Sequence, residues 1–155
     1  ISRSKRFKHS ISIAMIDIDH FKKYNDTNGH PMGDKLLQEC SQVLKKSVRD
    51  IDTVGRYGGE EFIIVFPQIK PSEILTAANR VVENVANTPF DNRELQPSKK
   101  VTISMGLLTN MDASLTPEEM IKEADKALYD AKRNGRNQVV AKVILKKGTN
   151  AIDVN

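Results

Sequence analysis

The sequence predicts an α/β sandwich, in which helices flank one central, mostly antiparallel five-stranded sheet in the order β-α-α-β-β-α-β-α-β. Residues 10–18 form a nearly continuous apolar run with several β-branched members, which is typical of a central strand buried on both faces. Apolar runs on both sides of Gly58 and Gly59 indicate a β-hairpin with a Gly-Gly turn. Helical spacing of apolar residues marks the segments 34–48, 72–85 and 117–131.

The first predicted strand ends in carboxylates, at the end of a sheet where open α/β domains bind ligands. Asp17 lies near the end of this strand and Asp19 follows it. A short helix begins at His20, and Asp19 is placed to cap that helix or to bind a metal, with the cap favoured. Residues 25–33 contain Asn, Gly and Pro and predict a loop, after which Asp34 opens the next helix and could cap it.

Two glutamates, Glu60 and Glu61, directly follow the glycines of the predicted hairpin. Glycine lets such a turn adopt positive φ and lets a bulky anion approach the backbone. Two carboxylates beside the turn suit a hard divalent cation that also holds phosphate oxygens. The alternative is an ordinary hairpin tip with solvated glutamates.

The second half of the chain continues the alternation of helices and strands. Residues 89–100 are polar and irregular and predict an exposed loop, and residues 101–108 alternate as a strand. Thr116 and Glu119 have the spacing of a capping box at the start of a helix. Residues 138–145 predict the last strand.

Composition predicts a single domain over residues 1–155, with peripheral segments at 1–10 and 146–155. The chain is 39% hydrophobic and 28% charged, which is ordinary for a domain with a real core. A net charge of +4 fits an anionic small ligand, whereas an aromatic content of 5% without Trp argues against nucleic-acid binding. Cys40 is the only cysteine, so no intrachain disulfide can form and a reducing, cytoplasmic location is expected. No apolar run reaches membrane-spanning length, although a longer parent protein could be membrane-anchored.

The segment Gly58–Phe62, which reads GGEEF, resembles the signature of the GGDEF family, the diguanylate cyclases. Two further blocks resemble this family and keep its order along the chain. They are Ile16–Lys22 with Asn25-Asp26, Gly29-His30 and Gly33-Asp34, and Ala124–Lys132 with Gly135-Arg136-Asn137. The family usually begins with an Asp-x-Leu-Thr-Gly-Leu-x-Asn-Arg segment. This sequence lacks the segment, and its absence indicates truncation upstream. Glu60 stands where many members carry Asp, and both supply a carboxylate.

The resemblance implies a palm-like, nucleotide-cyclase-like fold and an enzyme of bacterial signal transduction. Such an enzyme condenses two GTP molecules into cyclic di-GMP and releases two pyrophosphates. Each domain of a homodimer holds one GTP, and two Mg²⁺ or Mn²⁺ ions per active site assist the transfer. The resemblance also implies a regulatory sensor domain upstream and cyclic di-GMP as an inhibitor as well as a product.

Site residues follow from the same resemblance. The metal ligands would be Asp17, Glu60 and the backbone carbonyl of Ile18. Glu61 would be a further ligand or would help to deprotonate the attacking hydroxyl, and Lys22 would stabilise developing charge. Gly58 and Gly59 would allow the nucleotide close to the backbone.

The family's nucleotide contacts map onto a second set of residues. Asn25 and Asp34 would bind the guanine edge. The amides of His20 and Phe21 would hold the β- and γ-phosphates together with the side chains of Lys132 and Arg136.

The pair Arg49-x-x-Asp52 matches the family's inhibitory product site, with Arg80 as a secondary contact from a neighbouring domain. The structural alternative for Arg49 and Asp52 is a surface ion pair. The functional alternative for the whole chain is a catalytically silent module that binds GTP or cyclic di-GMP as a sensor.

Overall fold

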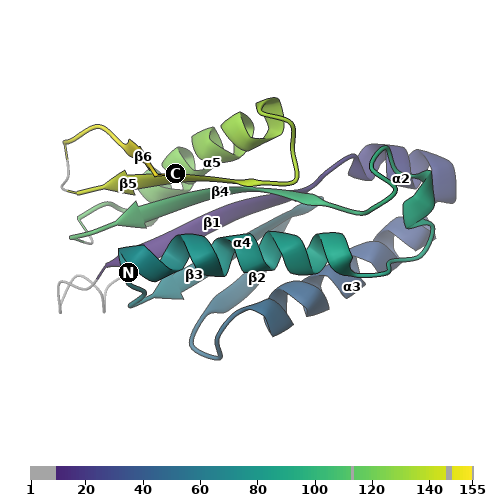
Figure 1. Ribbon diagram of the computed structural model, residues 1–155, viewed down its shortest axis with the longest axis horizontal. Coiled ribbons are helices and arrows are strands. Elements are labelled where there is room, and N and C mark those ends of the chain that lie inside the picture. The colour runs from purple at the N-terminus through teal and green to yellow at the C-terminus, as the bar shows by residue number, and fades with distance from the viewer. Residues whose placement is uncertain (1–9, 113, 146–147, 155) are drawn as a thin grey trace.

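A computed structural model describes residues 10–112, 114–145 and 148–154 and shows one six-stranded sheet between two layers of helices (Figure 1). The strand order is β2-β3-β1-β4-β5-β6. The strands are β1 (Ile11–Ile18), β2 (Thr53–Gly58), β3 (Glu61–Pro67), β4 (Ile103–Asn110), β5 (Val139–Ile144) and β6 (Ile152–Val154). The helices are α2 (Phe21–Asn28), α3 (His30–Ser47), α4 (Pro71–Asn87) and α5 (Pro117–Arg133), with a short 3₁₀ helix η1 (Arg93–Leu95) in the predicted loop 89–100.

The predicted sheet is confirmed as mostly antiparallel, but the number of strands is six rather than five. β1 pairs antiparallel with both β3 and β4, and only the β4–β5 pair is parallel. The extra strand β6 lies in the tail that was predicted to be peripheral. β6 pairs with β5, and its residue Val154 packs against the larger of the two apolar clusters, the one that includes Ile16 and Ala141. This contact holds the short strand on the sheet. Residues 1–9, 146–147 and 155 of the predicted peripheral segments lie outside the described residues.

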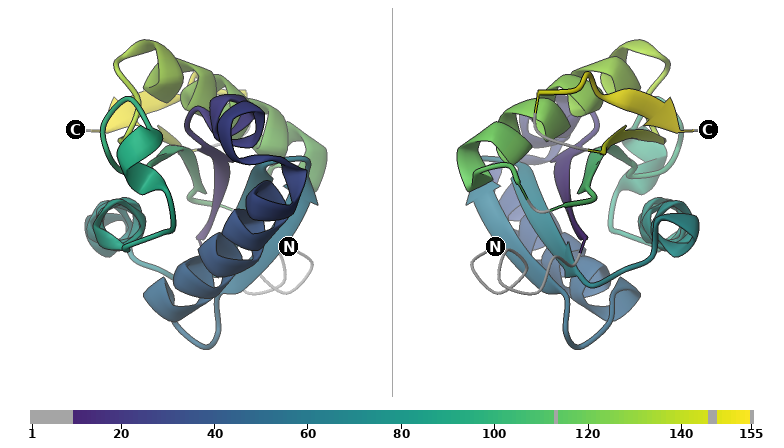
Figure 2. Two further views of the ribbon diagram at one scale, coloured as in Figure 1. Left: turned by 90° about the vertical axis from the view of Figure 1, so that its right-hand side faces the viewer. Right: turned by 90° about the vertical axis from the view of Figure 1, so that its left-hand side faces the viewer.

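Helices cover both faces of the sheet, as the two end-on views in Figure 2 show. Ala14, Ile16 and Ile18 of β1 belong to the apolar cluster under α2, α3 and α4. Ile13 and Met15 belong to a second cluster under α5. Successive side chains of a strand point to opposite faces, so β1 is buried along its whole length, as its unbroken apolar run predicted.

The predicted loop 25–33 is wrong, because two helices occupy it. α2 continues to Asn28, whose side-chain amide donates to the Tyr24 carbonyl, and α3 already begins at His30 with a proline in its first turn. Gly29, at φ 83°, makes the whole connection. Asp34 therefore lies inside α3 and does not open or cap it.

One other local prediction is confirmed. Thr116 and Glu119 form the capping box of α5, since each side chain bonds the other residue's backbone N–H. Cys40 is buried in α3, and burial raises the pKa of its thiol to about 12. Among the described residues, none of the helices combines the length and apolar character needed to cross a bilayer.

Candidate functional site

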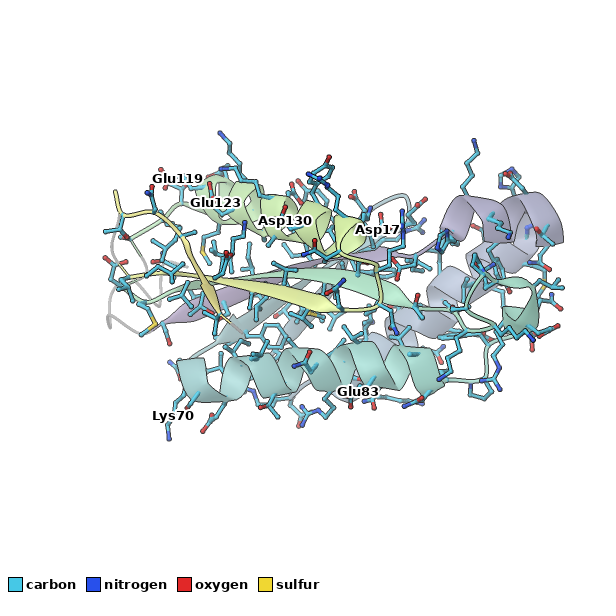
Figure 3. All side chains as sticks on the ribbon, turned by 45° about the horizontal axis from the view of Figure 1, so that its top comes forward. Asp17, Lys70, Glu83, Glu119, Glu123 and Asp130 are labelled. Carbon is cyan, nitrogen blue, oxygen red and sulfur yellow. The ribbon has the colours of Figure 1, made fainter. Side chains whose placement is uncertain are left out.

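Asp17 lies at the end of β1, at the point where three strands meet. Its register partners are Glu61 on β3 and Ser104 on β4. Its side chain is only 10% exposed, and Lys132 from α5 lies 2.7 Å from its Oδ2 atom. Figure 3 shows Asp17 close to the end of α5 that carries this lysine. Burial raises the pKa of Asp17, and the bond and charge of Lys132 oppose that rise.

The hairpin turn brings Glu60 to the end of β1, where Asp17 lies. β2 ends at Gly58, which pairs with Glu61, so Gly59 and Glu60 form the turn. The backbone N–H of Ile18 donates to the Glu60 carbonyl at 3.4 Å, which ties this turn to the end of β1. Burial raises the pKa of Glu60, and the charge of Asp17 raises it further. The backbone bond to Ile18 and this charge effect place Glu60 and Asp17 at the same end of the sheet.

The donor set fits a hard divalent cation. Mg²⁺ normally takes one or two protein carboxylates and completes its shell with phosphate oxygens and water. Asp17 and Glu60 supply two carboxylates, and the ammonium of Lys132 already compensates one of them. Ile18 is buried at the end of β1 and offers only its backbone carbonyl. Within the described part of the chain, His, Cys, Asp and Glu do not form a metal-binding group of three or more.

The sequence favoured Asp19 as the N-cap of α2, and this prediction is wrong. His20 occupies that position with φ 59°, and no side chain caps the helix. Asp19 is instead 4% exposed and accepts hydrogen bonds from Thr102, Ser104 and the backbone of Asn137. Because three donors already bind its carboxylate, we do not count Asp19 among the metal ligands.

Arg56 of β2 contacts the turn, and no sequence pattern indicated a role for it. Its Nε and Nη2 atoms donate to the Gly59 carbonyl at 3.0 and 2.6 Å. A Cβ atom added at Gly58 or Gly59 would meet no described atom within 4 Å. The backbone of the turn is therefore held from one side by Arg56 and faces open space at both glycines.

A hollow of about 550 Å³ lies between α3 and the hairpin. Asp34 lines it, together with Arg56 and Phe62 of the hairpin. On the neighbouring helix α2, the Oδ1 atom of Asn25 is buried and has no hydrogen-bond partner among the described residues. A buried acceptor without a partner is costly, and Asn25 does not itself line the hollow.

Gly33 explains how the Asn25 side chain fits beside α3, and the sequence reasoning gave it no role. A Cβ atom at Gly33 would collide with the carboxamide of Asn25. A glycine inside a helical pattern is the signal that could have revealed this close approach.

The predicted phosphate-binding groups lie on two elements around Asp17. His20 and Phe21 stand at the start of α2, where backbone N–H groups lack partners within the helix. Lys22 is exposed in the first turn of that helix. Lys132 lies in the last turn of α5, and Arg136 follows the helix in an exposed turn at φ 67°. The charge of Arg136 lowers the pKa of Asp17, which places the guanidinium in electrostatic reach of the carboxylate pair.

Arg49 and Asp52 are bonded to each other beyond the end of α3. The guanidinium donates to both carboxylate oxygens, at 2.7 and 3.2 Å, and the Arg49 backbone N–H adds a third bond. The Asp52 side chain is 2% exposed, whereas that of Arg49 is 38% exposed. Arg80 on α4 donates to the Ser47 carbonyl at the end of α3. The three residues thus lie around one helix end, away from Asp17.

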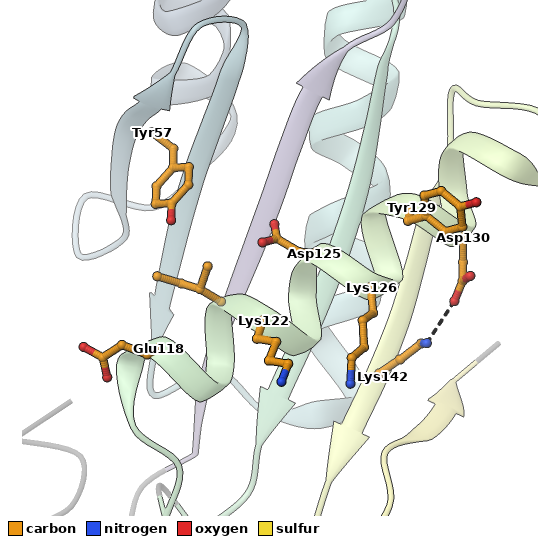
Figure 4. A pocket seen from close by; sticks show the side chains of 9 residues that line it. Tyr57, Glu118, Lys122, Asp125, Lys126, Tyr129, Asp130 and Lys142 are labelled. Carbon is orange, nitrogen blue, oxygen red and sulfur yellow. Dashed lines mark hydrogen bonds and ion pairs between the residues drawn. The ribbon is translucent and has the colours of Figure 1, made fainter.

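A second hollow, of about 800 Å³, lies between α5 and the hairpin (Figure 4). Tyr57 lies on its hairpin side, and Asp125 and Tyr129 lie on α5. Lys142 of β5 closes one end through its ion pair with Asp130. None of the predicted site residues lines this hollow, so it is distinct from the carboxylate site.

Comparison with known proteins places the chain in a family. Residues 1–138 match the family described as diguanylate cyclase, GGDEF domain. The chain is similar to the probable diguanylate cyclase DgcT of Escherichia coli, with 41% identity over 133 residues, or 86% of this chain. It spans 29% of the length of that relative.

Two solved structures share its fold. The GGDEF domain of DgcB from Caulobacter crescentus, in complex with c-di-GMP, has a TM-score of 0.81 and 31% identity over 90% of this chain and 82% of its own. The active GGEEF domain of a diguanylate cyclase from Vibrio cholerae has a TM-score of 0.80 and 31% identity over 90% of this chain and 87% of its own. The chain described here therefore belongs to the diguanylate cyclase GGDEF domain family.

Proposed function

We propose that this chain is the catalytic domain of a diguanylate cyclase, which condenses two GTP molecules into cyclic di-GMP and releases two pyrophosphates. The observation that carries the proposal is the meeting of Asp17 and Glu60 at the end of β1, beside the diglycine turn. The named cyclases among the relatives support it. The alternative of a silent sensor module is not favoured, because both carboxylates are present at the same end of the sheet.

Guanine would bind in the hollow between α3 and the hairpin. The Asp34 carboxylate, which lines this hollow, can accept from the N1–H and N2–H₂ donors that adenine lacks as a pair. The unpartnered Oδ1 of Asn25 offers a further acceptor. A site built from such acceptors discriminates strongly against a base that leaves them unpaired.

The phosphates would lie between the start of α2 and the end of α5. The amides of His20 and Phe21 would bind phosphate oxygens from the helix start. Lys132 and Arg136 would bind the β- and γ-phosphates through charge-assisted hydrogen bonds. Lys132 would then exchange its present bond to Asp17 for a phosphate contact. Gly58 and Gly59 leave the space that the nucleotide needs beside the hairpin.

Asp17, Glu60 and the Ile18 carbonyl would hold the metal. When bound, two Mg²⁺ or Mn²⁺ ions would neutralise the triphosphate and acidify the attacking hydroxyl. The 3′-oxygen of one GTP forms a bond to the α-phosphorus of the other, and the bond to the β-phosphate breaks so that pyrophosphate leaves. Glu61 would be a further ligand or would take the hydroxyl proton, and Lys22 would stabilise the charge that develops.

Each domain would hold one GTP, so two domains must face each other as a homodimer. A regulatory sensor domain upstream would control their approach, and the reaction would take place in the cytoplasm. The relatives leave room for such a domain, because this chain spans only 29% of DgcT.

The test is incubation of the chain with GTP and Mg²⁺ at high protein concentration, with chromatographic detection of the products. We expect cyclic di-GMP and pyrophosphate in a ratio of about one to two. Glu60→Gln should abolish both products, and Glu83→Gln, which changes an exposed glutamate on α4, is the matched control. Binding of GTP without any product from the native chain would favour the silent module instead.

The product site would comprise Arg49, Asp52 and Arg80. The Arg49 side chain is 38% exposed and uses Nε and Nη2 to bond Asp52 and the Pro67 carbonyl, so Nη1 would be the group that binds guanine or phosphate. We expect Arg49→Ala to abolish inhibition by added cyclic di-GMP while the initial rate without product is retained. An inhibition curve identical to that of the native chain would assign Arg49 and Asp52 to an ordinary ion pair.

A further inference from the structure

The turn between α5 and β5 has an unusual backbone. Gly135, Arg136 and Asn137 all have positive φ, at 114°, 67° and 47°. Two successive non-glycine residues in the left-handed region are unfavourable, and such a turn persists only where its surroundings hold it. The turn carries Arg136, which belongs to the proposed phosphate site.

Asp19 supplies the long-range bond to this turn. Its Oδ2 atom accepts from the Asn137 backbone N–H at 3.1 Å and from the Thr102 hydroxyl at 2.8 Å. Its Oδ1 atom accepts from the Ser104 hydroxyl at 2.7 Å. Its own N–H donates to the Thr102 carbonyl. The carboxylate thus joins the end of β1, the start of β4 and the turn after α5.

The buried surroundings of Asp19 hold its carboxylate in position for the bond to the Asn137 N–H. The side chain is 4% exposed, and Thr102 and Ser104 are also buried. A buried carboxylate keeps its charge only where donors are fixed around it, and hydrogen bonds to a charged acceptor are stronger than neutral ones. Asp19 is also two residues from Asp17, so the same stretch of backbone sets the positions of both carboxylates.

We propose that Asp19 is a positioning residue that fixes the Gly135–Asn137 turn, and with it Arg136, against the metal-binding end of β1. In the proposed function, on which this inference rests, Asp19 would keep Arg136 aimed at the β- and γ-phosphates while Asp17 and Glu60 would hold the metal. Asp19 touches neither substrate nor metal. Its role is to hold Arg136 at a fixed position relative to Asp17 and Glu60.

The test compares Asp19→Asn with the native chain by two measurements. In Asp19→Asn, the side-chain carboxamide offers the Asn137 backbone N–H either another donor or a weaker acceptor. Hydrogen exchange of the Asn137 backbone N–H should therefore accelerate. Affinity for 3′-deoxy-GTP, which lacks the attacking hydroxyl, should fall about tenfold. Affinity for the matched monophosphate should stay unchanged, because it lacks the phosphates that Arg136 would bind.

Ser104→Ala is the matched control, because it removes one bond to the same carboxylate but leaves the Asn137 contact. It should lower stability without changing the ratio of the two affinities. An equal loss of both affinities in Asp19→Asn, or native exchange at Asn137, would overturn the proposal. If the native chain binds no guanine nucleotide, the proposed function fails, while the exchange measurement still decides whether Asp19 holds the turn.

A second pair of variants applies if Asp19→Asn does not fold. Asn137→Pro removes the N–H donor of the same bond and also the left-handed conformation of the residue, because proline fixes φ at about −65°, whereas Asn137→Gly keeps the donor and suits the φ of 47°. We expect the triphosphate-specific loss of affinity in the proline variant alone. Equal triphosphate affinities in the two variants would contradict the positioning role.

Discussion

At the scale of single residues, the Glu60 carboxylate is held in an environment that disfavours its charge. Burial is the main cause of its raised pKa, and the charge of Asp17 adds to it. Electrostatic cost of this kind is common where a site is built to receive a cation, because the bound cation relieves it. The same cost predicts how stability depends on pH.

We expect Glu60→Gln to be more stable than the native chain at neutral pH. The folded pKa of Glu60 lies above its ordinary value of 4.5, so the native state retains the proton over a range in which the unfolded chain has lost it. The contribution of this group to stability is therefore complete below 4.5 and is lost as pH rises through the folded pKa. Urea unfolding between about pH 4 and pH 8 measures this, and the difference between the two chains should disappear at the acid end.

The exposed Glu83→Gln variant controls for the removal of one negative charge. A Glu60→Gln chain that is less stable than the native chain at neutral pH would show that its carboxylate is stabilised in the absence of ligand.

Gly33 allows a second prediction at this scale, because its missing side chain makes room for Asn25. Alanine inside α3 should raise helix stability by up to about 1 kcal/mol. It should nevertheless weaken GTP binding about tenfold, since the displaced Asn25 loses a hydrogen bond to the base. Calorimetric titration of 3′-deoxy-GTP measures the loss.

A double-mutant cycle shows whether the effect passes through Asn25. In an Asn25→Ala background, Gly33→Ala should cost no further affinity. Additive losses in the double variant would mean that Gly33 acts independently of the Asn25 side chain.

At the scale of elements, the packing of α5 on β4 depends on one glycine. A Cβ atom at Gly106 would collide with the Ala124 carbonyl and the Leu128 N–H of the helix backbone. Gly106→Ala must push α5 away from the sheet, so we expect a loss of about 1–3 kcal/mol of unfolding free energy in urea titrations. Gly55→Ala on β2 is the matched strand control, because its Cβ would lie at an ordinary 3.5 Å from Ile63. Equal losses in both variants would contradict the close-packing explanation.

The elements that the sequence predicted well are those specified by neighbouring residues. The unbroken apolar run predicted β1, the diglycine predicted the hairpin, and Thr116 with Glu119 predicted the start of α5. Each pattern expresses a bond or a burial preference that acts over a few positions.

The elements and contacts that it missed depend on partners far away in the chain. Asp19 bonds to Thr102, Ser104 and Asn137, which are 83, 85 and 118 positions away, so its local position as a helix cap was misleading. β6 is short and exists through its pairing with β5. The residues of the predicted loop 25–33 belong to α2 and α3, apart from Gly29 between them. Burial of Tyr24 and Leu36 against the core overrides the weak helix propensity of these residues.

At the scale of the whole molecule, the proposed site is open on the side where a second nucleotide must approach. A Cβ atom added at Gly58 or Gly59 would meet no described atom within 4 Å, and Glu60 follows these glycines at the tip, directly before β3. In the proposed function, one chain would hold one GTP in the hollow beside α3, and the α-phosphate would need a hydroxyl from another nucleotide. Each chain would then supply half of the reaction centre, and association of two chains would become part of the kinetics.

This arrangement predicts that the rate per chain rises with protein concentration at saturating GTP. If two monomers must associate before reaction, the fraction of competent chains follows mass action, so the rate per chain grows linearly at low concentration and levels off once the dimer is populated. A dilution series of initial rates, combined with sedimentation to measure the monomer fraction at each concentration, tests this. The rate per chain should follow the dimer fraction, and Glu83→Gln should give the same curve because its site lies on the far helix α4. A rate per chain that stays constant while sedimentation shows only monomer would mean that one domain completes the reaction alone, and would contradict the proposed dimer.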